Sequence, residues 1–191
     1  MKIMAIDPGT TESAYVILDD QYQIISADKV GNDVVLSIIA DAPGLDAVII
    51  EDIEPRYSST DRSAAGAVMG QSTIETIKAF GRFSWQASLR GLMVGSIFRR
   101  DERSYLIPTK RNGLPPLPET APKHADGQIR ASLIRRFARH DQERGRGTKA
   151  NPDTFYGFRG DMWQAMAVGV TWLDQEKRRV KCERKEKTRK R

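Results

Sequence analysis

Two short apolar runs, each ending in an acid, constrain the fold of this chain more than any other feature. Residues 3–6 (IMAI) lead into Asp7 and a Pro-Gly turn signal, and residues 47–50 (AVII) lead into Glu51. Continuous apolar runs of this length are typical of strands that are buried on both faces of a sheet. A buried acid is costly unless it is paired or bound to a metal ion, so both acids call for a positive partner.

The remaining pattern predicts an α/β order of elements. After a first strand at 2–7 we expect strands at 13–18 and 22–30, which form an antiparallel meander with short turns. The elements predicted after them are a helix capped by Asn32 or Asp33, a parallel strand at 47–50, a helix over 66–89, a strand at 92–98, a helix over 129–137 capped by Asp126, and a helix over 161–173. This is the order of the ribonuclease H-like fold. We therefore predict a five-stranded mixed sheet, with three antiparallel and two parallel strands, flanked by helices.

Length and composition limit the domain organisation. A chain of 191 residues with 39% apolar residues is the size of one domain with a sizeable core. We assign 1–176 to a single domain of this fold and 177–191 to a basic tail that is disordered when unbound. The polar segment 54–64 and the proline-rich segment 108–122 are expected to be irregular.

The sequence also limits the cellular setting. No apolar stretch approaches the roughly 18–20 residues that span a bilayer, and the start lacks a signal-peptide pattern, so no membrane is expected as a partner. The only cysteine, Cys182, excludes a disulfide framework and a cysteine-based zinc site. A reducing, cytoplasmic location is therefore expected.

The net charge of +6 hides a strong asymmetry along the chain. Residues 1–89 carry six Lys and Arg against 13 Asp and Glu, whereas residues 90–149 carry 14 against six. Residues 150–176 carry one against four, and residues 177–191 carry ten against two. An acidic half beside basic segments suits a protein that holds metal ions and, around them, a polyanion. A solubilising surface with a frayed tail is the alternative.

Three acids are predicted to meet at one edge of the sheet. Asp7 and Glu51 end neighbouring strands, and Asp161 lies in the first turn of the last helix, which can pack beside that edge. Converging acids repel one another, but with Mg²⁺ they become ligands, because oxygen donors suit a hard cation. Two such ions can activate a water and stabilise the leaving oxygen in phosphodiester cleavage. The simpler interpretations are turn chemistry for Asp7, a strand end that reaches water for Glu51 and a helix-start acid for Asp161.

Several blocks around these acids resemble RuvC-type Holliday junction resolvases, most closely the bacteriophage branch of that family. The blocks are IDPGTTESAYVI on the first strand, IIED on the glutamate strand, the glycine-marked helix GAVMGQSTIETIKAFGRF, and two C-terminal blocks, ADGQIRASLIRRF and GTKANPDTFYGFRGDMWQAMAVGVTWLD. The last block is the most specific, because its Gly-Thr-Lys, Tyr-Gly and Asp-x-Trp-x-Ala sequence is hard to meet by chance. Together the blocks cover about half of the chain.

The resemblance implies a Mg²⁺-dependent endonuclease that acts as a homodimer on four-way DNA junctions and cuts symmetric strands. Mn²⁺ is expected to substitute for Mg²⁺. By motif position, the resemblance implies that Asp7, Glu51 and Asp161 are the catalytic metal ligands. For a bacteriophage protein, the cytoplasm would be that of the host cell.

The chain departs from the family pattern at one acid. Bacterial members often carry a second acid on the last helix, three residues after the first, and this position is Gln164 here. A fourth carboxylate would then come from elsewhere, and Asp126 and Asp153 are the candidates. Bacterial members also use a lysine ahead of the penultimate helix, for which Lys123 is nearest.

Basic residues on and before the penultimate helix are candidates for DNA contacts. Phosphate contacts position a nucleic acid without reading its sequence, which suits recognition of a branch by its shape. The candidates are Lys110, Arg111, Lys123, Arg130, Arg135 and Arg136. A solvated helix face is the alternative for the arginines. Tyr57, in the polar segment, is a candidate for stacking at the centre of a junction.

The helix predicted over 66–89 has two interpretations. It is apolar on more than one side, so it can support a two-fold dimer or simply pack in the core. Glu75 in this helix is interpreted as structural, through pairing with an arginine such as Arg82, and indirect binding of a second metal ion is the alternative.

Three other functions stay open from the sequence. The DPGTT stretch also resembles the phosphate loop of actin-like ATPases and sugar kinases, although those need two such domains. Another ribonuclease H-like nuclease, acting on RNA–DNA hybrids or flaps, would use the same chemistry. A non-catalytic DNA-binding protein would use only the basic segments.

Overall fold

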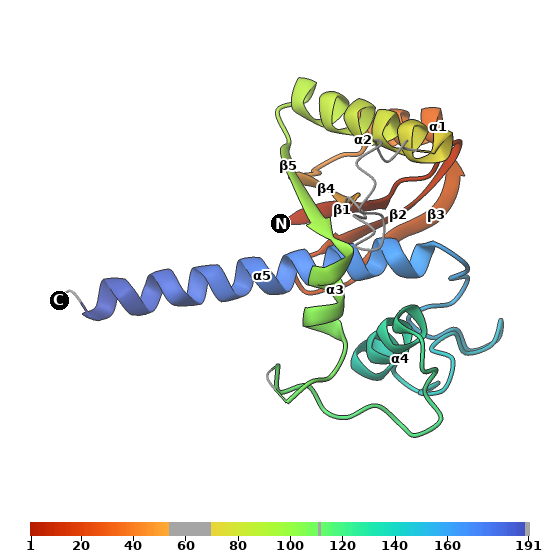
Figure 1. Ribbon diagram of the computed structural model, residues 1–191, viewed down its shortest axis with the longest axis vertical. Coiled ribbons are helices and arrows are strands. Elements are labelled where there is room, and N and C mark those ends of the chain that lie inside the picture. Colours follow the sequence, from red (N-terminus) through yellow and green to blue (C-terminus); the bar gives the residue numbers. More distant parts are fainter. Residues whose placement is uncertain (54–69, 111, 190–191) are drawn as a thin grey trace, which may run out of the picture.

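A five-stranded mixed sheet forms the centre of the molecule (Figure 1). The computed structural model describes residues 1–53, 70–110 and 112–189. The strands are β1 (Lys2–Asp7), β2 (Glu12–Asp19), β3 (Ile24–Gly31), β4 (Ala47–Asp52) and β5 (Met93–Phe98). Their order is β3-β2-β1-β4-β5; β1, β2 and β3 pair antiparallel, and β1, β4 and β5 pair parallel. The predicted mixed sheet is confirmed.

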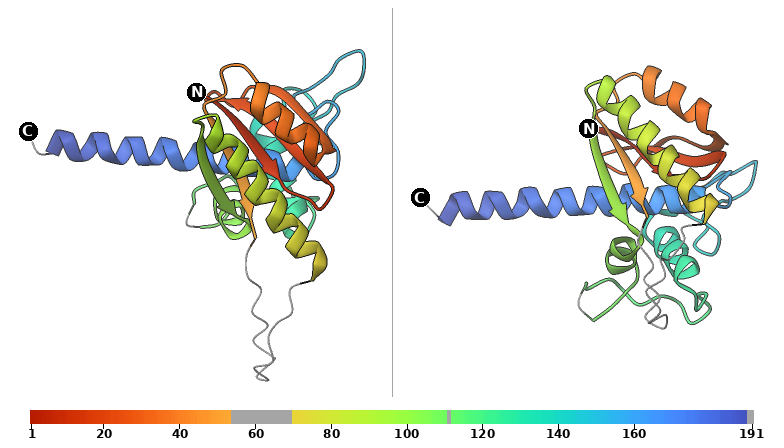
Figure 2. Two further views of the ribbon diagram at one scale, coloured as in Figure 1. Left: turned by 90° about the horizontal axis from the view of Figure 1, so that it is seen from above. Right: turned by 45° about the horizontal axis from the view of Figure 1, so that its top comes forward.

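Helices cover both faces of this sheet (Figures 1 and 2). On one face lie α1 (Asn32–Asp41) and α2 (Gln71–Leu89). On the other lies α5 (Met162–Arg189), with α3 (Arg99–Leu106) and α4 (Ala125–Phe137) packed against it. Among the described residues, no helix combines the length and apolarity needed to cross a membrane.

The apolar run of β1 reflects burial on both faces. Ile3 and Ala5 pack toward α5, whereas Met4 and Ile6 pack toward α1 and α2, and all four are fully buried. The α5 helix approaches the sheet most closely at Gly169, where a Cβ atom would lie 2.7 Å from Leu18 Cδ1 and 3.0 Å from Ala5 Cβ. The start of α5 is therefore held against β1.

Two predicted helix caps are wrong, because both side chains bind partners far away in the sequence. Asn32 begins α1, but its amide donates to the carbonyl oxygens of Gly9 (3.1 Å) and Thr10 (3.2 Å) and accepts from Ser13 Oγ (2.7 Å). Asn32 thus fixes the turn that follows β1. Asp126 lies inside the first turn of α4 and binds Arg99 in place of a backbone N–H.

The structure also differs at the third strand and at the tail. The third strand begins at Ile24, because the preceding residues form a tight turn in which Tyr22 has φ 63°. Residues 177–189, which we expected to be disordered, continue α5 and project from the body (Figure 1). Ion pairs of Arg179 with Glu176 (2.7 Å) and Glu183 (3.7 Å) stabilise this part of the helix.

Some expectations fall outside the described residues. These are Tyr57, Arg111, the polar segment from residue 54 onward and the first residues of the helix predicted over 66–89. The described part of the proline-rich segment 108–122 contains neither helix nor strand, as predicted.

Substituting Gly169→Ala should destabilise the protein by about 1–3 kcal/mol, because the added methyl group overpacks a buried contact between α5 and the sheet. The measurement is the urea midpoint followed by circular dichroism. Gly81→Ala in α2 is the matched control, since nothing lies within 4 Å of its added Cβ. This control should stabilise by about 0.5–1 kcal/mol. Equal effects at the two sites would contradict the close approach of α5.

Candidate active site

Asp7 and Glu51 lie side by side at the carboxyl edge of the sheet. In the parallel register of β1 and β4, Ile6 pairs with Ile50, so the next residue of each strand emerges at the same place. The two carboxyl groups are close enough to share a hydrogen bond when Asp7 carries a proton. The structure thus brings together the two acids that the apolar runs predicted.

The negative charge of this pair of acids is only partly neutralised by neighbouring side chains. Burial, and then the charges of Glu51 and Asp161, raise the pKa of Asp7 to about 8. Burial also raises the pKa of Glu51, although the Arg99 guanidinium opposes the shift. A proton or a cation at Asp7 therefore relieves a repulsion that the surrounding side chains leave in place.

Arg99, at the start of α3, links the acids around this site. Its guanidinium donates to Glu51 at 3.2 and 3.4 Å and to Asp126 at 2.8 Å. It also lies 3.8 Å from Glu102, one turn further along α3. Asp7, Glu51, Arg99 and Asp126 line one cavity of about 600 Å³, referred to below as the acid cavity.

Glu102 is a functional candidate that the sequence analysis missed. Its side chain is fully buried, and neither carboxyl oxygen has a hydrogen-bond partner among the described residues. Burial, followed by the charge of Glu51, raises the pKa of Glu102 to about 9. Glu102 is therefore held as a neutral acid near pH 7, next to Arg99.

Asp161 lies near the acid pair but faces another partner. It immediately precedes α5, and its backbone carbonyl accepts the N–H groups of Gln164 and Ala165 in the first turn of that helix. Its half-exposed carboxylate forms an ion pair with Lys29 on β3 at 2.7 Å. Its charge still contributes to the raised pKa of Asp7. The role of Asp161 as a metal ligand stays a prediction.

The two candidates for a fourth carboxylate, Asp126 and Asp153, lie in different places. Asp126 lines the acid cavity. Asp153 is buried elsewhere and accepts backbone N–H groups at 2.6–3.0 Å from Arg139, His140, Asp141 and Thr154. These bonds hold the pKa of Asp153 well below its usual range against the opposing effect of burial. Asp153 is therefore a structural residue of the loop before α5, and its assignment as a possible ligand was wrong.

The donor set at the acid pair fits a hard divalent cation. Asp7 and Glu51 offer carboxylate oxygens, the ligands that Mg²⁺ prefers, and Arg99 neutralises only part of their negative charge. Within the described ranges, no cluster of three or more His, Cys, Asp and Glu side chains forms a ready-made metal site. Asp7 and Glu51 therefore form the core of the candidate site, in which no third carboxylate is in place among the described residues.

The predicted DNA-binding residues occupy different environments. Lys110 and Arg178 of α5 line one cavity, and Lys123 is exposed before α4. Arg130 stacks over the Trp163 ring at 4.6 Å, and Arg135 donates to the carbonyl oxygen of Pro116.

Arg136 has a structural contact that the sequence analysis did not anticipate. It binds Asp174 of α5 through two hydrogen bonds, at 2.6 and 2.8 Å, which join α4 to α5.

Glu75 on α2 does not form the predicted pair with Arg82. It pairs with Lys78 at 2.9 Å, and Arg82 binds Asp33. The structural interpretation of Glu75 is consistent with this contact.

Comparison with known proteins identifies the class of fold. No protein-family model matches the chain, and no curated protein matches its sequence. Among solved structures, Thermus thermophilus RuvC in complex with a Holliday junction substrate matches with a TM-score of 0.56, over 90% of this chain and 91% of that chain, at 12% identity. A second Thermus thermophilus RuvC structure matches with a TM-score of 0.53, over 90% and 92%, at 14% identity. The chain therefore has the ribonuclease H-like fold of RuvC, as predicted.

In metal-free protein, Glu102→Gln should become increasingly stabilising, relative to the parent, as the pH rises from about 5 to about 9. The folded parent keeps a proton on Glu102 that the unfolded chain releases above its normal pKa, so the parent loses stability across this range. Glutamine has no proton to lose. The gain at the upper end should reach roughly 1 kcal/mol or more, since one pKa unit corresponds to about 1.4 kcal/mol.

Urea unfolding in EDTA at several pH values measures this gain. Glu143→Gln, at an exposed position, is the control and should stay within about 0.5 kcal/mol of the parent at each pH. A Glu102→Gln difference that does not change with pH would contradict a neutral buried Glu102.

Proposed function

We propose that this protein is a divalent-metal-dependent endonuclease that cuts branched DNA, with the four-way junction as its substrate. The observation that carries the proposal is the adjacent pair Asp7 and Glu51, which end two neighbouring parallel strands of a RuvC-like sheet. The Thermus relative with this fold was captured with a Holliday junction substrate. A cytoplasmic location is part of this proposal.

Each side chain of the candidate site has a distinct task in this proposal. Asp7 and Glu51 would hold Mg²⁺, and Asp161, which is paired with Lys29 in this structure, would be the third ligand. A bound Mg²⁺ supplies Lewis acidity at the phosphodiester and lowers the pKa of a water nucleophile. Arg99 keeps Glu51 directed into the acid cavity through its two bonds to that carboxylate.

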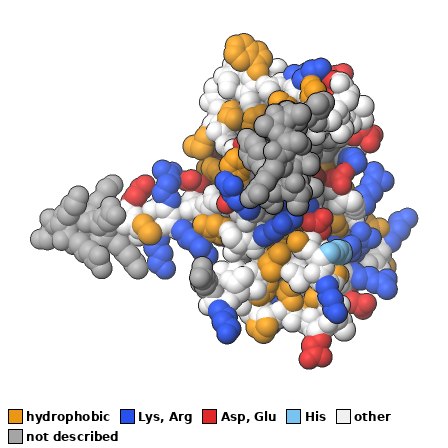
Figure 3. Space-filling model, in the orientation of Figure 1, with side chains coloured by type: hydrophobic (Ala, Val, Ile, Leu, Met, Phe, Trp, Pro, Cys, Tyr) orange, Lys and Arg blue, Asp and Glu red, His pale blue; other side chains and the backbone are white. Residues whose placement is uncertain are grey.

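The distribution of charge supports a polyanion as substrate. Lys and Arg side chains gather around α3, α4 and the loop after α4, and along α5 (Figure 3). Lys110, Lys123, Arg130 and Arg135 are the proposed phosphate contacts from this set. Arg136 is a weaker candidate, because Asp174 already neutralises it.

Asp7→Asn should lower Mg²⁺-dependent cleavage of a synthetic four-way junction by at least about a hundredfold, because several kcal/mol of metal-ion stabilisation is lost. DNA binding should persist. The assay compares a four-way junction, a three-way junction, a flap and an RNA–DNA hybrid, and symmetric nicks confined to the four-way junction are expected. A second measurement, the rise in melting temperature on adding Mg²⁺, should also disappear in the variant.

Asp33→Asn is the matched control for this experiment, since Asp33 is an exposed acid on α1 and should leave cleavage unchanged. Cleavage of only the flap or the hybrid would overturn the junction as substrate but retain the nuclease. Undiminished cleavage by Asp7→Asn would overturn the assignment of the site.

We also propose that the protein acts as a homodimer through α2 and the edge strand β5. Trp85 and Leu89 are exposed on one face of α2 (67% and 64%), and Met93 on β5 is exposed to 53%. Residues four apart on a helix share a face, so Trp85 and Leu89 form an apolar surface on α2, and Met93 begins the strand that follows this helix. A two-fold dimer would supply two sites for two symmetric strands.

Trp85→Glu should raise the dissociation constant of this dimer at least about thirtyfold, because a buried Trp anchor contributes about 2 kcal/mol or more. Size-exclusion chromatography with light scattering, over a range of concentrations, measures the change. Val34→Glu on α1, half exposed in a similar way, is the control and should leave the dimer intact. A monomer in the parent protein would contradict the dimer.

A further inference from the structure

The projecting helix, which is the part of α5 formed by residues 177–189, is not used by the proposed chemistry. It extends away from the body of the molecule (Figures 1 and 2). At 1.5 Å per residue, it is about 20 Å long. Its side chains from 177 to 183 are all exposed. A polar helix of this kind either depends on ion pairs along its surface or joins the protein to a partner.

One face of the projecting helix carries a row of cations. Lys177, Lys181, Arg184 and Lys185 follow one another at spacings of four, three and one residue. At 3.6 residues per turn, these positions lie along one side of the helix, which is called the cationic face below. Lys181 is exposed and forms no ion pair within the described part of the chain, so its charge is available to a partner.

The acids of the projecting helix and of the residue before it lie on the opposite side. Glu176, Glu183 and Glu186 follow one another at spacings of seven and three residues, and this side is called the acidic face. Arg179 lies among these acids and pairs with Glu176 and Glu183. The helix therefore separates its charges by face, whereas a surface that serves only solubility would mix them.

The cationic face looks toward the side of the molecule that carries α3 and α4. Arg178 lies on this face, and its guanidinium is 4.5 Å from the ring centre of Tyr105 on α3. Arg178 also lines a cavity of about 520 Å³ together with Lys110. One turn earlier on the same side of α5, Asp174 binds Arg136 of α4.

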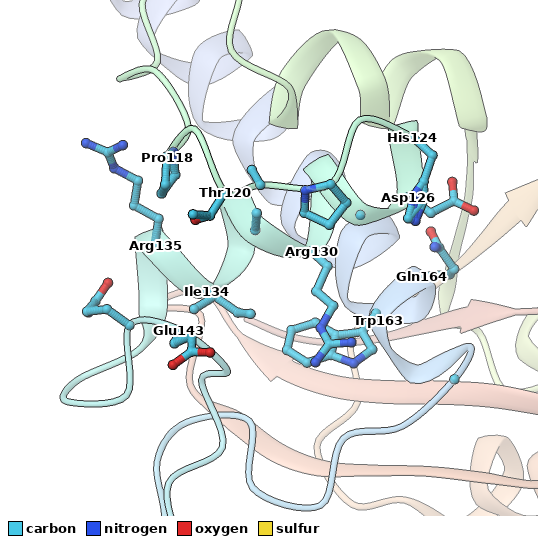
Figure 4. A pocket seen from close by; sticks show the side chains of 16 residues that line it. Pro118, Thr120, His124, Asp126, Arg130, Ile134, Arg135, Glu143, Trp163 and Gln164 are labelled. Carbon is cyan, nitrogen blue, oxygen red and sulfur yellow. The ribbon is translucent and has the colours of Figure 1, made fainter.

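The proposed phosphate contacts of the body lie on α4, next to the candidate site. Arg130 and Arg135 line a cavity of about 670 Å³ between the proline-rich segment, α4 and the start of α5 (Figure 4). Asp126 lines both this cavity and the acid cavity. Cations are therefore present from the candidate site, over α4 and α3, to the projecting helix (Figure 3).

The composition of the projecting helix selects among partners. Its only apolar residues are Val180 and Cys182, so it has neither the apolar seam of a coiled coil nor the apolar face of a helix that lies on a membrane. The cationic face of a second copy would repel it. Duplex DNA carries one negative charge per about 1.7 Å of its axis and can therefore meet a row of cations along its whole length.

We infer that the cationic face of the projecting helix binds the phosphate backbone of one duplex arm of the branched DNA, away from the position of the cut. The inference rests on the proposed function and adds to it a contact outside the body of the protein. The helix spans about six base pairs, at 3.4 Å for each pair. Phosphate contacts fix the orientation of a duplex without reading its sequence, so this contact sets the direction in which the arm leaves the protein.

The test compares two double variants of the whole chain that remove equal charge from opposite faces. Lys181→Gln with Lys185→Gln removes two cations from the cationic face, and Arg179→Gln with Lys187→Gln removes two from the acidic face. Glutamine is a good helix former, and circular dichroism confirms that both variants keep the helix. Affinity for a four-way junction is measured by fluorescence anisotropy in EDTA, over a range of salt concentrations.

The cationic-face variant should bind a long-armed junction at least about tenfold more weakly near 0.1 M salt, and its salt slope should flatten by about 1.8, since each phosphate contact contributes about 0.9. The acidic-face variant should stay within about twofold of the parent, because charges on the far side of a helix, about 10 Å away, are screened. When the arms are shortened stepwise, the difference between the variants should disappear, because the arm no longer reaches the helix.

The outcomes separate this inference from the proposed function. Equal weakening in both variants, unchanged binding in both, or a difference that persists at every arm length would overturn the arm contact. Cleavage with Mg²⁺ at saturating protein should be equal in the cationic-face variant and the parent, since the projecting helix does not line the acid cavity. Binding that depends on the cationic face, to a junction that is never cut, would overturn the nuclease and leave the arm contact standing.

Discussion

The parallel pairing of β1 with β4 is the constraint on which the rest of the site depends. Because both faces of the sheet are covered, these strands are apolar up to the acids at their carboxyl ends. Their register then places Asp7 beside Glu51 at one edge. The resulting repulsion is relieved only in part by Arg99, because that guanidinium is shared between Glu51 and Asp126. The fold therefore concentrates negative charge where a cation would stabilise it most.

The sequence predicts this pair well, because strand ends and sheet order fix where such residues emerge. It predicts Asp161 less completely. The position before the last helix is right, but the partner of its carboxylate is Lys29 on β3, and that contact depends on how α5 crosses the sheet. A residue's place in an element can be read locally, whereas the direction of an exposed side chain requires the packed structure.

The residues that sequence reasoning missed share a physical cause. The helix α3 has the sequence RRDERSYL, which carries too few apolar residues to show a helical period, so Arg99 and Glu102 gave no signal. The two wrong caps reflect the same limit, since Asn32 and Asp126 bind distant partners that outcompete the local N–H groups. The tail did carry a signal, the spacing of Glu176, Arg179 and Glu183, which favours a helix over disorder.

Asp126 joins the two cavities into one unit. Its carboxylate accepts a hydrogen bond from Arg99 Nη2, and Nη1 of the same guanidinium donates to Glu51. Because the guanidinium is rigid and planar, a displacement of Asp126 would also displace Glu51. Positioning a reacting phosphate within a fraction of an ångström strongly affects its rate of cleavage. Because Arg99 fixes the position of Glu51, its contact with Asp126 would contribute to that positioning.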